Sequence, residues 1–252
     1  MRGLVIACGR FFFRTRNFVF PLVLLVLMAI DRPLLAFGTW TGKAWVDALG
    51  VTVALAGQAL RAVTIGLAYI RRGGLGGRVY ADRLVVEGIF AHSRNPLYVG
   101  NFLGLVGYII VFHGRLLYAL GVPFFVFAYI AIVLNEEQFL RGKFGAEYEA
   151  YCRRVPRFVP RFRGIRQTLD GASFDWARVV RKEYGTTMTG ATLLLGLLVW
   201  TRWQLGGREL GLAWLRIAVP IEALCLVAYL AARRFKKSGR LGQGARETPA
   251  SS

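Results

Sequence analysis

Residues 83–100 read RLVVEGIFAHSRNPLYVG, and they mark the point at which a basic loop gives way to a membrane-length apolar run. Pro96 has no backbone N–H donor and a fixed φ, so it suits the first turn of a helix. The proline ring keeps Asn95 out of the α region, and asparagine is a good N-cap. A helix that begins here directs free N–H groups at the loop, beside the charge of Arg94. The junction is therefore either a site for an anionic group or an ordinary helix start with an interfacial arginine.

The composition is typical of a membrane protein. The chain has 252 residues, of which 55% are hydrophobic, and a formal net charge of +19. Several apolar runs are long enough to cross a bilayer, which takes about 20 residues. The basic residues lie in blocks between these runs, as the positive-inside rule expects. Nucleic acid is not expected as a partner, because no soluble domain remains to bind it.

Metal and disulfide sites are not expected. The three cysteines, Cys8, Cys152 and Cys225, are far apart in the sequence, and neither they nor the two histidines match the spacing of metal ligands. We therefore interpret the cysteines as unpaired thiols in or near the membrane.

Six apolar runs predict an all-α, polytopic membrane bundle of about six transmembrane helices. They cover residues 18–30, 45–70, 97–112, 116–134, 186–203 and 210–232. A signal peptide is the alternative for the first run, but it lacks a small-x-small exit, so we expect a retained helix. Pro123 predicts a kink in the fourth run. Residues 136–185 contain no spanning run and predict an amphipathic, basic segment along the headgroups on the cytoplasmic side.

An acidic pair, Glu136 and Glu137, lies where the fourth run ends. The third and fourth runs form a hairpin, so this pair should meet Arg94 at one face of the membrane. Two adjacent carboxylates at the end of a helix repel each other and are disfavoured by its dipole. Either they pair with Arg94, Arg83 or Arg141, or they face a ligand that carries hydroxyls, an amino group or a sulfonium.

Five segments of the chain follow one another in a recognisable order. They read LVVEGIF (residues 84–90), RNPLYVG (94–100), EE (136–137), FGAEYEAY (144–151) and VPRFVP (155–160). In order and spacing they resemble the isoprenylcysteine carboxyl methyltransferase and phospholipid methyltransferase superfamily of integral membrane enzymes. The resemblance implies methyl transfer from S-adenosyl-L-methionine to a lipidic or hydrophobic acceptor, such as an isoprenylcysteine-type carboxylate or a phospholipid amine.

The resemblance also implies a set of site residues. The backbone around Leu84 and Val85, with Phe90, would frame the adenosine, while residues 95–98 would hold the methionine part and Glu136 a polar group of the cofactor. The complete cofactor-binding set is Arg83, Leu84, Val85, Gly88, Phe90, Asn95, Pro96, Leu97, Tyr98 and Glu136. The catalytic candidates are Arg94, to orient an acidic headgroup or the cofactor carboxylate, and Glu137, to accept the proton of an acceptor amine.

Three departures from the family pattern keep other functions open. Asn95 stands where the family usually has histidine, and Phe90 where it has tyrosine. Residues 132–134 are apolar where the eukaryotic carboxyl methyltransferases carry an arginine on the substrate side, which weakens the case for a prenylated-peptide carboxylate. The alternatives are an NADPH-dependent membrane reductase of sterol type and a non-catalytic scaffold with a decayed cofactor pocket.

These observations divide the chain into four parts. We expect N-terminal transmembrane helices in residues 1–80, the methyltransferase core with its cofactor site in 81–164, an amphipathic segment and two further transmembrane helices in 165–237, and a disordered tail in 238–252. Nearly all Lys and Arg fall in alternate loops, so both termini and the site are predicted to be cytoplasmic. The expected partners are membrane lipids and a hydrophobic or lipidated small molecule, while the oligomeric state stays open.

Overall fold

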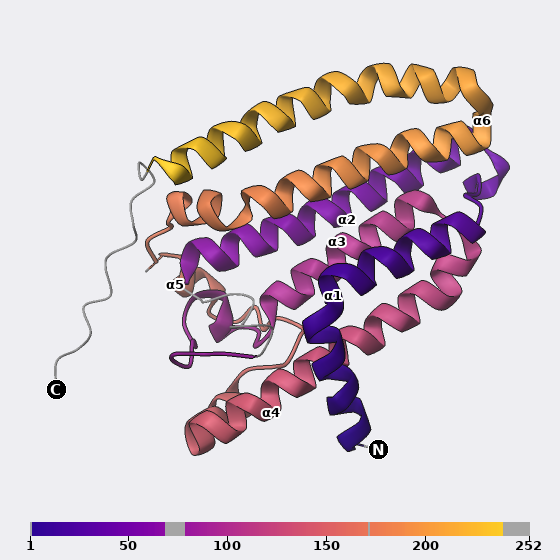
Figure 1. The fold of residues 1–252 in the computed structure, drawn as a ribbon. Coiled ribbons are helices and arrows are strands. Elements are labelled where there is room, and N and C mark those ends of the chain that lie inside the picture. Colours follow the sequence, from indigo (N-terminus) through magenta and orange to yellow (C-terminus); the bar gives the residue numbers. More distant parts are fainter. Residues whose placement is uncertain (1, 69–78, 171, 239–252) are drawn as a thin grey trace.

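The computed structural model describes residues 2–68, 79–170 and 172–238, and these residues form a bundle of helices (Figure 1). The α-helices are α1 (Arg2–Ile30), α2 (Trp40–Leu67), α3 (Pro96–Phe112), α4 (Val122–Arg154), α5 (Ile165–Asp170) and α6 (Trp176–Lys237). The short 3-10 turns η1 (Ala36–Gly38) and η2 (Gly88–Ala91) and the π turn η3 (Leu117–Gly121) connect them. No strand occurs in the described residues, so the all-α prediction is confirmed.

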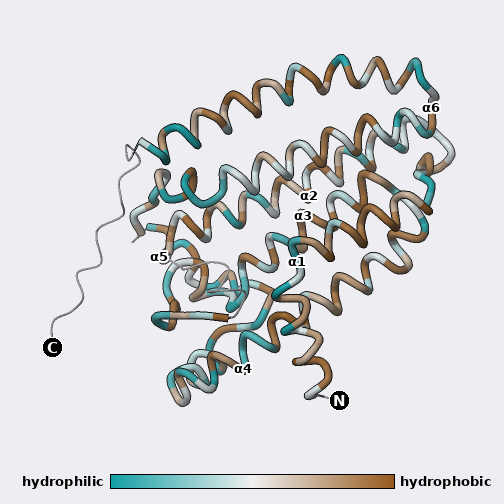
Figure 2. The backbone as a smooth tube through the Cα atoms, viewed as in Figure 1, coloured by the Kyte–Doolittle hydropathy of each residue, from teal (hydrophilic) through white to brown (hydrophobic). Residues whose placement is uncertain are grey.

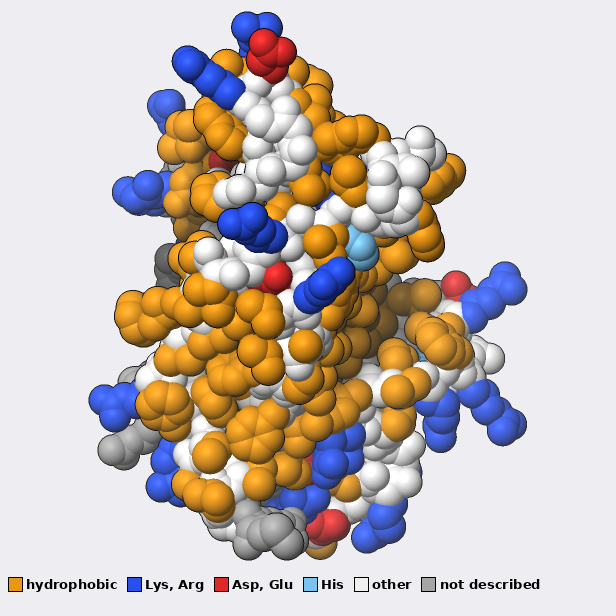
Figure 3. Space-filling view, turned by 90° about the vertical axis from the view of Figure 1, so that its right-hand side faces the viewer, with side chains coloured by type: hydrophobic (Ala, Val, Ile, Leu, Met, Phe, Trp, Pro, Cys, Tyr) orange, Lys and Arg blue, Asp and Glu red, His pale blue; other side chains and the backbone are white. Residues whose placement is uncertain are grey.

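Four helical segments are long and apolar enough to cross a membrane. They are Gly3–Ile30, Trp40–Leu67, Leu117–Arg154 and Trp176–Lys237, and α3 is a shorter apolar helix of 17 residues. The 62-residue α6 folds back on itself at Gly207, whose φ of 74° lies in the left-handed region that favours glycine (Figure 1). Its two arms contain the fifth and sixth predicted runs. Hydrophobic side chains are spread over much of the face that Figure 3 shows, as expected for helices that face lipid.

Three predicted boundaries differ from the structure. The first helix starts at Arg2, so the basic N-terminal residues are helical rather than a separate leader to the apolar run. Pro123 lies in the first turn of α4, where the ring is tolerated, and the irregular turn η3 precedes it instead of a kink within the helix. The amphipathic piece of residues 136–151 continues α4, which is interrupted only at Gly145 with a φ of 49°. Residues 69–78 of the loop before α3, and residues 239–252 of the tail predicted to be disordered, lie outside the described residues.

Helices α2 and α3 approach each other through glycines. A Cβ atom on Gly57 would stand 2.5 Å from the carbonyl oxygen of Gly100, and one on Gly107 would stand 2.5 Å from that of Gly50. Small residues allow such close packing of helices in lipid. The backbone nitrogen of Gly104 takes part in the close approach, since it would lie 2.7 Å from the Cβ on Gly57. A Cβ on Gly104 itself would meet no atom of the described residues within 4 Å.

This contact gives a matched pair of stability predictions. Gly57→Ala should lower the thermal unfolding temperature, because overpacking costs about 1–3 kcal/mol and exceeds the gain in helix propensity. Gly104→Ala should leave the temperature unchanged or raise it, because its methyl group has free space. Thermal unfolding of the two purified variants in the same detergent measures the difference. Equal unfolding temperatures would contradict the close approach of α2 and α3.

An ion pair inside the bundle ties α6 to α2. Arg61 binds both carboxylate oxygens of Glu183, with Nε–Oε2 and Nη2–Oε1 distances of 2.9 Å, and Gln58 donates to the same carboxylate at 3.2 Å. Both partners of the ion pair are buried. The polar residues Gln58 and Arg61 in the second apolar run therefore face protein, and they hold the first arm of α6 against α2.

Candidate cofactor site

Tyr98 and Glu136 meet at the open end of the α3–α4 hairpin. The Tyr98 phenol, in the first turn of α3, donates a hydrogen bond to Oε1 of Glu136 on α4 at 2.6 Å. Arg16 of α1 donates from Nη1 to the same phenol oxygen at 2.7 Å. Its guanidinium lies over the ring of Phe13, 4.6 Å from the centroid. Three helices that are distant in sequence thus bring a carboxylate, a phenol and a cation together.

Glu137 points the other way, into the protein, and is 1% exposed. Arg157 binds both of its oxygens, with Nε–Oε1 at 2.8 Å and Nη2–Oε2 at 2.9 Å. Arg94 lies 3.1 Å from Oε1 and Arg141 lies 3.4 Å from Oε2. The hydrogen bonds to the Glu137 carboxylate raise the pKa of Arg157. Two of the pairings considered above, with Arg94 and with Arg141, are therefore confirmed.

The loop before α3 lies against the proline-rich segment that follows α4. The backbone N–H of Arg94 donates to the carbonyl of Pro156 at 2.9 Å, and the Asn95 amide donates to the carbonyl of Arg157 at 3.0 Å. Ser93 Oγ also donates to a carbonyl of this segment, that of Phe158, at 2.9 Å. These bonds join two of the five sequence segments into one surface beside Tyr98 and Glu136.

Asn95 does not cap α3 with its side chain, contrary to the prediction. It occupies the N-cap position with φ −131° and ψ 49°, and no cap hydrogen bond forms. The physical reason is the competing carbonyl of Arg157, to which the amide donates instead. Pro96 does occupy the first turn of α3, as predicted, and it is buried there.

The segment predicted to frame the adenosine is anchored on the last turns of α4. Leu84 packs against a cluster that contains Tyr148 and Tyr151, and the Tyr151 hydroxyl donates to the carbonyl of Phe90 at 2.7 Å. Gly88 has a φ of 60°, which favours glycine, and an added Cβ would lie 3.2 Å from Leu67. Phe90 and Leu84 are thus held at the same end of the molecule as Asn95.

Two of the predicted site residues, Arg83 and Arg94, are engaged in ion pairs within the protein. Arg83 is 62% exposed at its side chain and pairs with Glu87 at 3.0 Å, not with the acidic pair. Arg94 is 10% exposed, and its Nη1 contacts both Glu137 and the sulfur of Cys152, the latter at 2.6 Å. Its Nε is buried and has no hydrogen-bond partner in the described part of the chain. Arg94 is therefore engaged inside the protein on one side of its guanidinium.

Sequence reasoning missed Arg16 and Arg157. Arg157 lies in the VPRFVP segment, and its place in that motif was a usable signal for a partner of the acidic pair. Arg16 had no such signal, because nothing in the sequence separates it from Arg10 and Arg14. Its orientation toward Tyr98 is fixed only when α1 packs beside α4.

The donors and acceptors of this site fit a polar, partly cationic ligand. Glu136 accepts a single hydrogen bond among the described residues, from Tyr98, so its carboxylate has lone pairs left for a hydroxyl or an ammonium group. In Figure 2 hydrophilic residues gather around the last part of α4 and around α5, while much of the middle of the helices is apolar. The site lies at this polar boundary.

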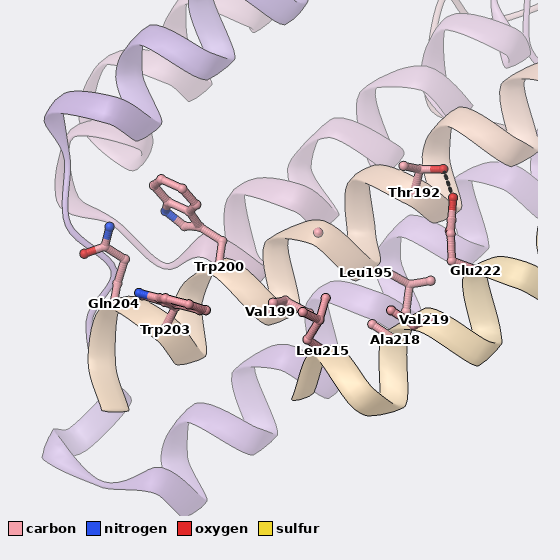
Figure 4. A pocket seen from close by; sticks show the side chains of 11 residues that line it. Thr192, Leu195, Val199, Trp200, Trp203, Gln204, Leu215, Ala218, Val219 and Glu222 are labelled. Atoms are coloured by element: carbon pink, nitrogen blue, oxygen red, sulfur yellow. Dashed lines mark hydrogen bonds between the residues drawn. The ribbon is translucent and has the colours of Figure 1, made fainter. Parts of the chain in front are cut away.

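A hollow that contains none of the site residues lies between the two arms of α6 (Figure 4). Its volume is about 560 Å³, and aliphatic and tryptophan side chains such as Val199, Trp200 and Leu215 line it. Glu222 and Thr192 form a hydrogen bond across it. None of the residues that line this hollow belongs to the cofactor site.

Residues 28–147 match the family model of the phospholipid methyltransferases. The chain is 34% identical over 125 residues to a nickel-cobalt-cadmium resistance protein of Alcaligenes xylosoxydans xylosoxydans, covering 49% of this chain and 53% of that protein. It is 31% identical over 159 residues to a cobalt-zinc-cadmium resistance protein of Cupriavidus metallidurans, covering 63% and 70%. The match thus spans about half of the first relative's length.

A shorter part of the chain matches a protein that is named as an enzyme. The chain is 41% identical over 81 residues to methanethiol S-methyltransferase 2 of Bradyrhizobium diazoefficiens, which covers 32% of this chain and 30% of that protein. No solved structure shows a significant match.

Proposed function

The chain belongs to the phospholipid methyltransferase family, and we propose that it transfers a methyl group from S-adenosylmethionine to a hydrophobic acceptor at a membrane. Members of this family use S-adenosylmethionine as their methyl donor. Family membership favours methyl transfer over the sterol-type reductase considered above. The single observation that carries the proposal is the hydrogen bond between Tyr98 and Glu136, which closes the polar end of the α3–α4 hairpin.

The residues of the site have separate tasks in this proposal. When bound, S-adenosylmethionine supplies an activated methyl group on a sulfonium, and its transfer depends on alignment more than on acid–base help. Residues 84–90 frame the adenosine and residues 95–98 hold the methionine part. Glu136 accepts hydrogen bonds from a polar group of the cofactor.

Glu137 and Arg94 act as positioning residues in this proposal. Three guanidinium groups surround the Glu137 carboxylate, so its oxygens are occupied and shielded from an acceptor. Proton acceptance from an amine, the other role considered for Glu137, would require the carboxylate to leave these partners. Arg94 instead joins the loop before α3 to α4 through Glu137.

The acceptor has two candidate classes. A lipidic or other hydrophobic molecule suits the membrane-spanning bundle, and the site lies where the apolar helices meet the polar end of α4. A small thiol is the second candidate, because one relative is a methanethiol S-methyltransferase. Both classes present a nucleophile that must reach the site from the bilayer or from its surface.

We infer six membrane crossings, by α1, α2, α3, the apolar part of α4 and the two arms of α6. With the basic loops on the inner side, both termini and the cofactor site would face the cytoplasm. Among the described residues, α1, α2, the segment Leu117–Arg154 and the whole of α6 have the length and composition of a membrane span.

Incubation of membranes with methyl-labelled S-adenosylmethionine tests the proposed function. Base-labile label indicates an ester, label on an extractable headgroup indicates a lipid amine, and a volatile labelled sulfide after addition of a thiol indicates S-methylation. Membranes that contain Glu136→Ala serve as the control and should show only background label. Equal labelling with and without the intact protein would rule out methyl transfer.

A further inference from the structure

Arg16 is a cation in the site that forms no ion pair with any described carboxylate. Its Nη1 donates to the Tyr98 hydroxyl, and no carboxylate lies within 4 Å of its guanidinium among the described residues. The side chain is half-buried, whereas Arg10 and Arg14 on the same helix are exposed. A partly desolvated guanidinium is stabilised by an anion that it can bind through parallel hydrogen bonds.

Arg16 and Glu136 flank one oxygen atom. The Tyr98 hydroxyl accepts from the guanidinium at 2.7 Å and donates to the carboxylate at 2.6 Å, so opposite charges stand on either side of the phenol without pairing directly. Each keeps hydrogen-bonding capacity, because the guanidinium has five donors and the carboxylate about four acceptor sites. This arrangement is complementary to a zwitterion whose two charged groups are close together.

We propose that Arg16, Tyr98 and Glu136 form a clamp for the α-amino acid end of S-adenosylmethionine, in which Arg16 binds the carboxylate and Glu136 the ammonium group. The inference rests on the proposed function and adds to it a residue from α1, outside the five sequence segments. Arg94 is the weaker choice for the carboxylate, because Glu137 and Cys152 already engage its guanidinium.

The clamp predicts that two ligands, one with and one without the carboxylate, should bind with different affinities. In nanodiscs, isothermal titration of the wild-type protein with S-adenosylmethionine and with decarboxylated S-adenosylmethionine should give a weaker affinity for the second. Arg16→Gln should lower the affinity for S-adenosylmethionine about tenfold or more, as expected for the loss of a charge-assisted hydrogen bond. The same variant should bind the decarboxylated ligand within about twofold of the wild type, because that ligand lacks the group that Arg16 binds. Arg14→Gln, which removes the same charge from an exposed position on α1, should bind both ligands as the wild type does.

Each outcome decides the inference. If Arg16→Gln binds S-adenosylmethionine as the wild type does, Arg16 does not contact the cofactor and the clamp is wrong. If it weakens both ligands equally, Arg16 acts on the fold or on Tyr98 and not on the carboxylate, and the clamp is again wrong. Arg16→Lys, which keeps the charge without the planar fork, should recover part of the lost affinity. Failure of the wild-type protein to bind S-adenosylmethionine at all would overturn the proposed function, and the clamp with it.

Discussion

Replacing Glu137 by alanine should destabilise the protein by about 3–5 kcal/mol, the cost of leaving buried charges without their partner. Its carboxylate is the common counter-ion of Arg94, Arg141 and Arg157, and it joins the loop before α3 to the segment after α4. Because a whole domain is stable by only about 5–15 kcal/mol, we expect little folded Glu137→Ala protein to be recovered. Thermal unfolding in detergent, together with the folded fraction on gel filtration, measures the effect.

A glutamate elsewhere on α4 provides the matched control for Glu137. Glu149 pairs with Arg141 at 2.8 Å, but its side chain is 49% exposed. Glu149→Ala should therefore change stability by less than about 1 kcal/mol. Glu137→Gln, which keeps the shape of the side chain but removes its charge, should fall between the two. A Glu137→Ala protein as stable as Glu149→Ala would show that the three arginines do not depend on this carboxylate.

Replacing Glu136 by alanine should have the opposite effect from replacing Glu137. We expect a large loss of cofactor affinity and little loss of stability. Its one hydrogen bond among the described residues is to Tyr98, so its removal leaves no buried cluster of charges unpaired. A hydrogen bond to a charged group contributes about 1.5–3 kcal/mol, so the affinity for S-adenosylmethionine should fall about 10- to 100-fold. Calorimetric titration of the folded variant measures the affinity, and methyl transfer should fall with it.

Two variants sharpen the Glu136 prediction. Tyr98→Phe keeps the ring but removes the hydroxyl that orients Glu136, so its affinity should lie between those of the wild type and Glu136→Ala. Glu147→Ala, at an exposed position on α4, should bind S-adenosylmethionine normally. If Glu136→Ala keeps wild-type affinity, this carboxylate has no part in holding the cofactor.

The sequence allowed the helices and the meeting of their ends to be predicted, because these follow from local signals. Pro96 marked the start of α3, and apolar length marked the spanning runs. The return of the α3–α4 hairpin brought Tyr98 and Glu136 to one end. Side-chain orientations were not predictable in the same way. Asn95 turns to a carbonyl 62 residues away instead of capping its own helix, because that carbonyl is supplied only by the folded chain.

The acidic pair illustrates the same limit. Adjacent residues on a helix point in different directions, so Glu136 faces Tyr98 while Glu137 faces three arginines. The sequence offered pairing and ligand binding as alternatives for both residues together. The packing of α4 between the loop before α3 and the segment after α4 separates the two cases. The packing of α1 beside α4 brings Arg16 to a site that no motif linked to the N-terminal helix.

The most direct test of the account is to locate the bound cofactor on the chain. Ultraviolet irradiation of the protein in nanodiscs with methyl-labelled S-adenosylmethionine, followed by peptide mapping, identifies the segments that touch it. We expect label on peptides that contain residues 84–98 and Glu136, and we expect unlabelled S-adenosylhomocysteine to suppress it. Suppressible label confined to the arms of α6, or no suppressible label at all, would contradict a methyl-donor site between the start of α3 and the polar half of α4.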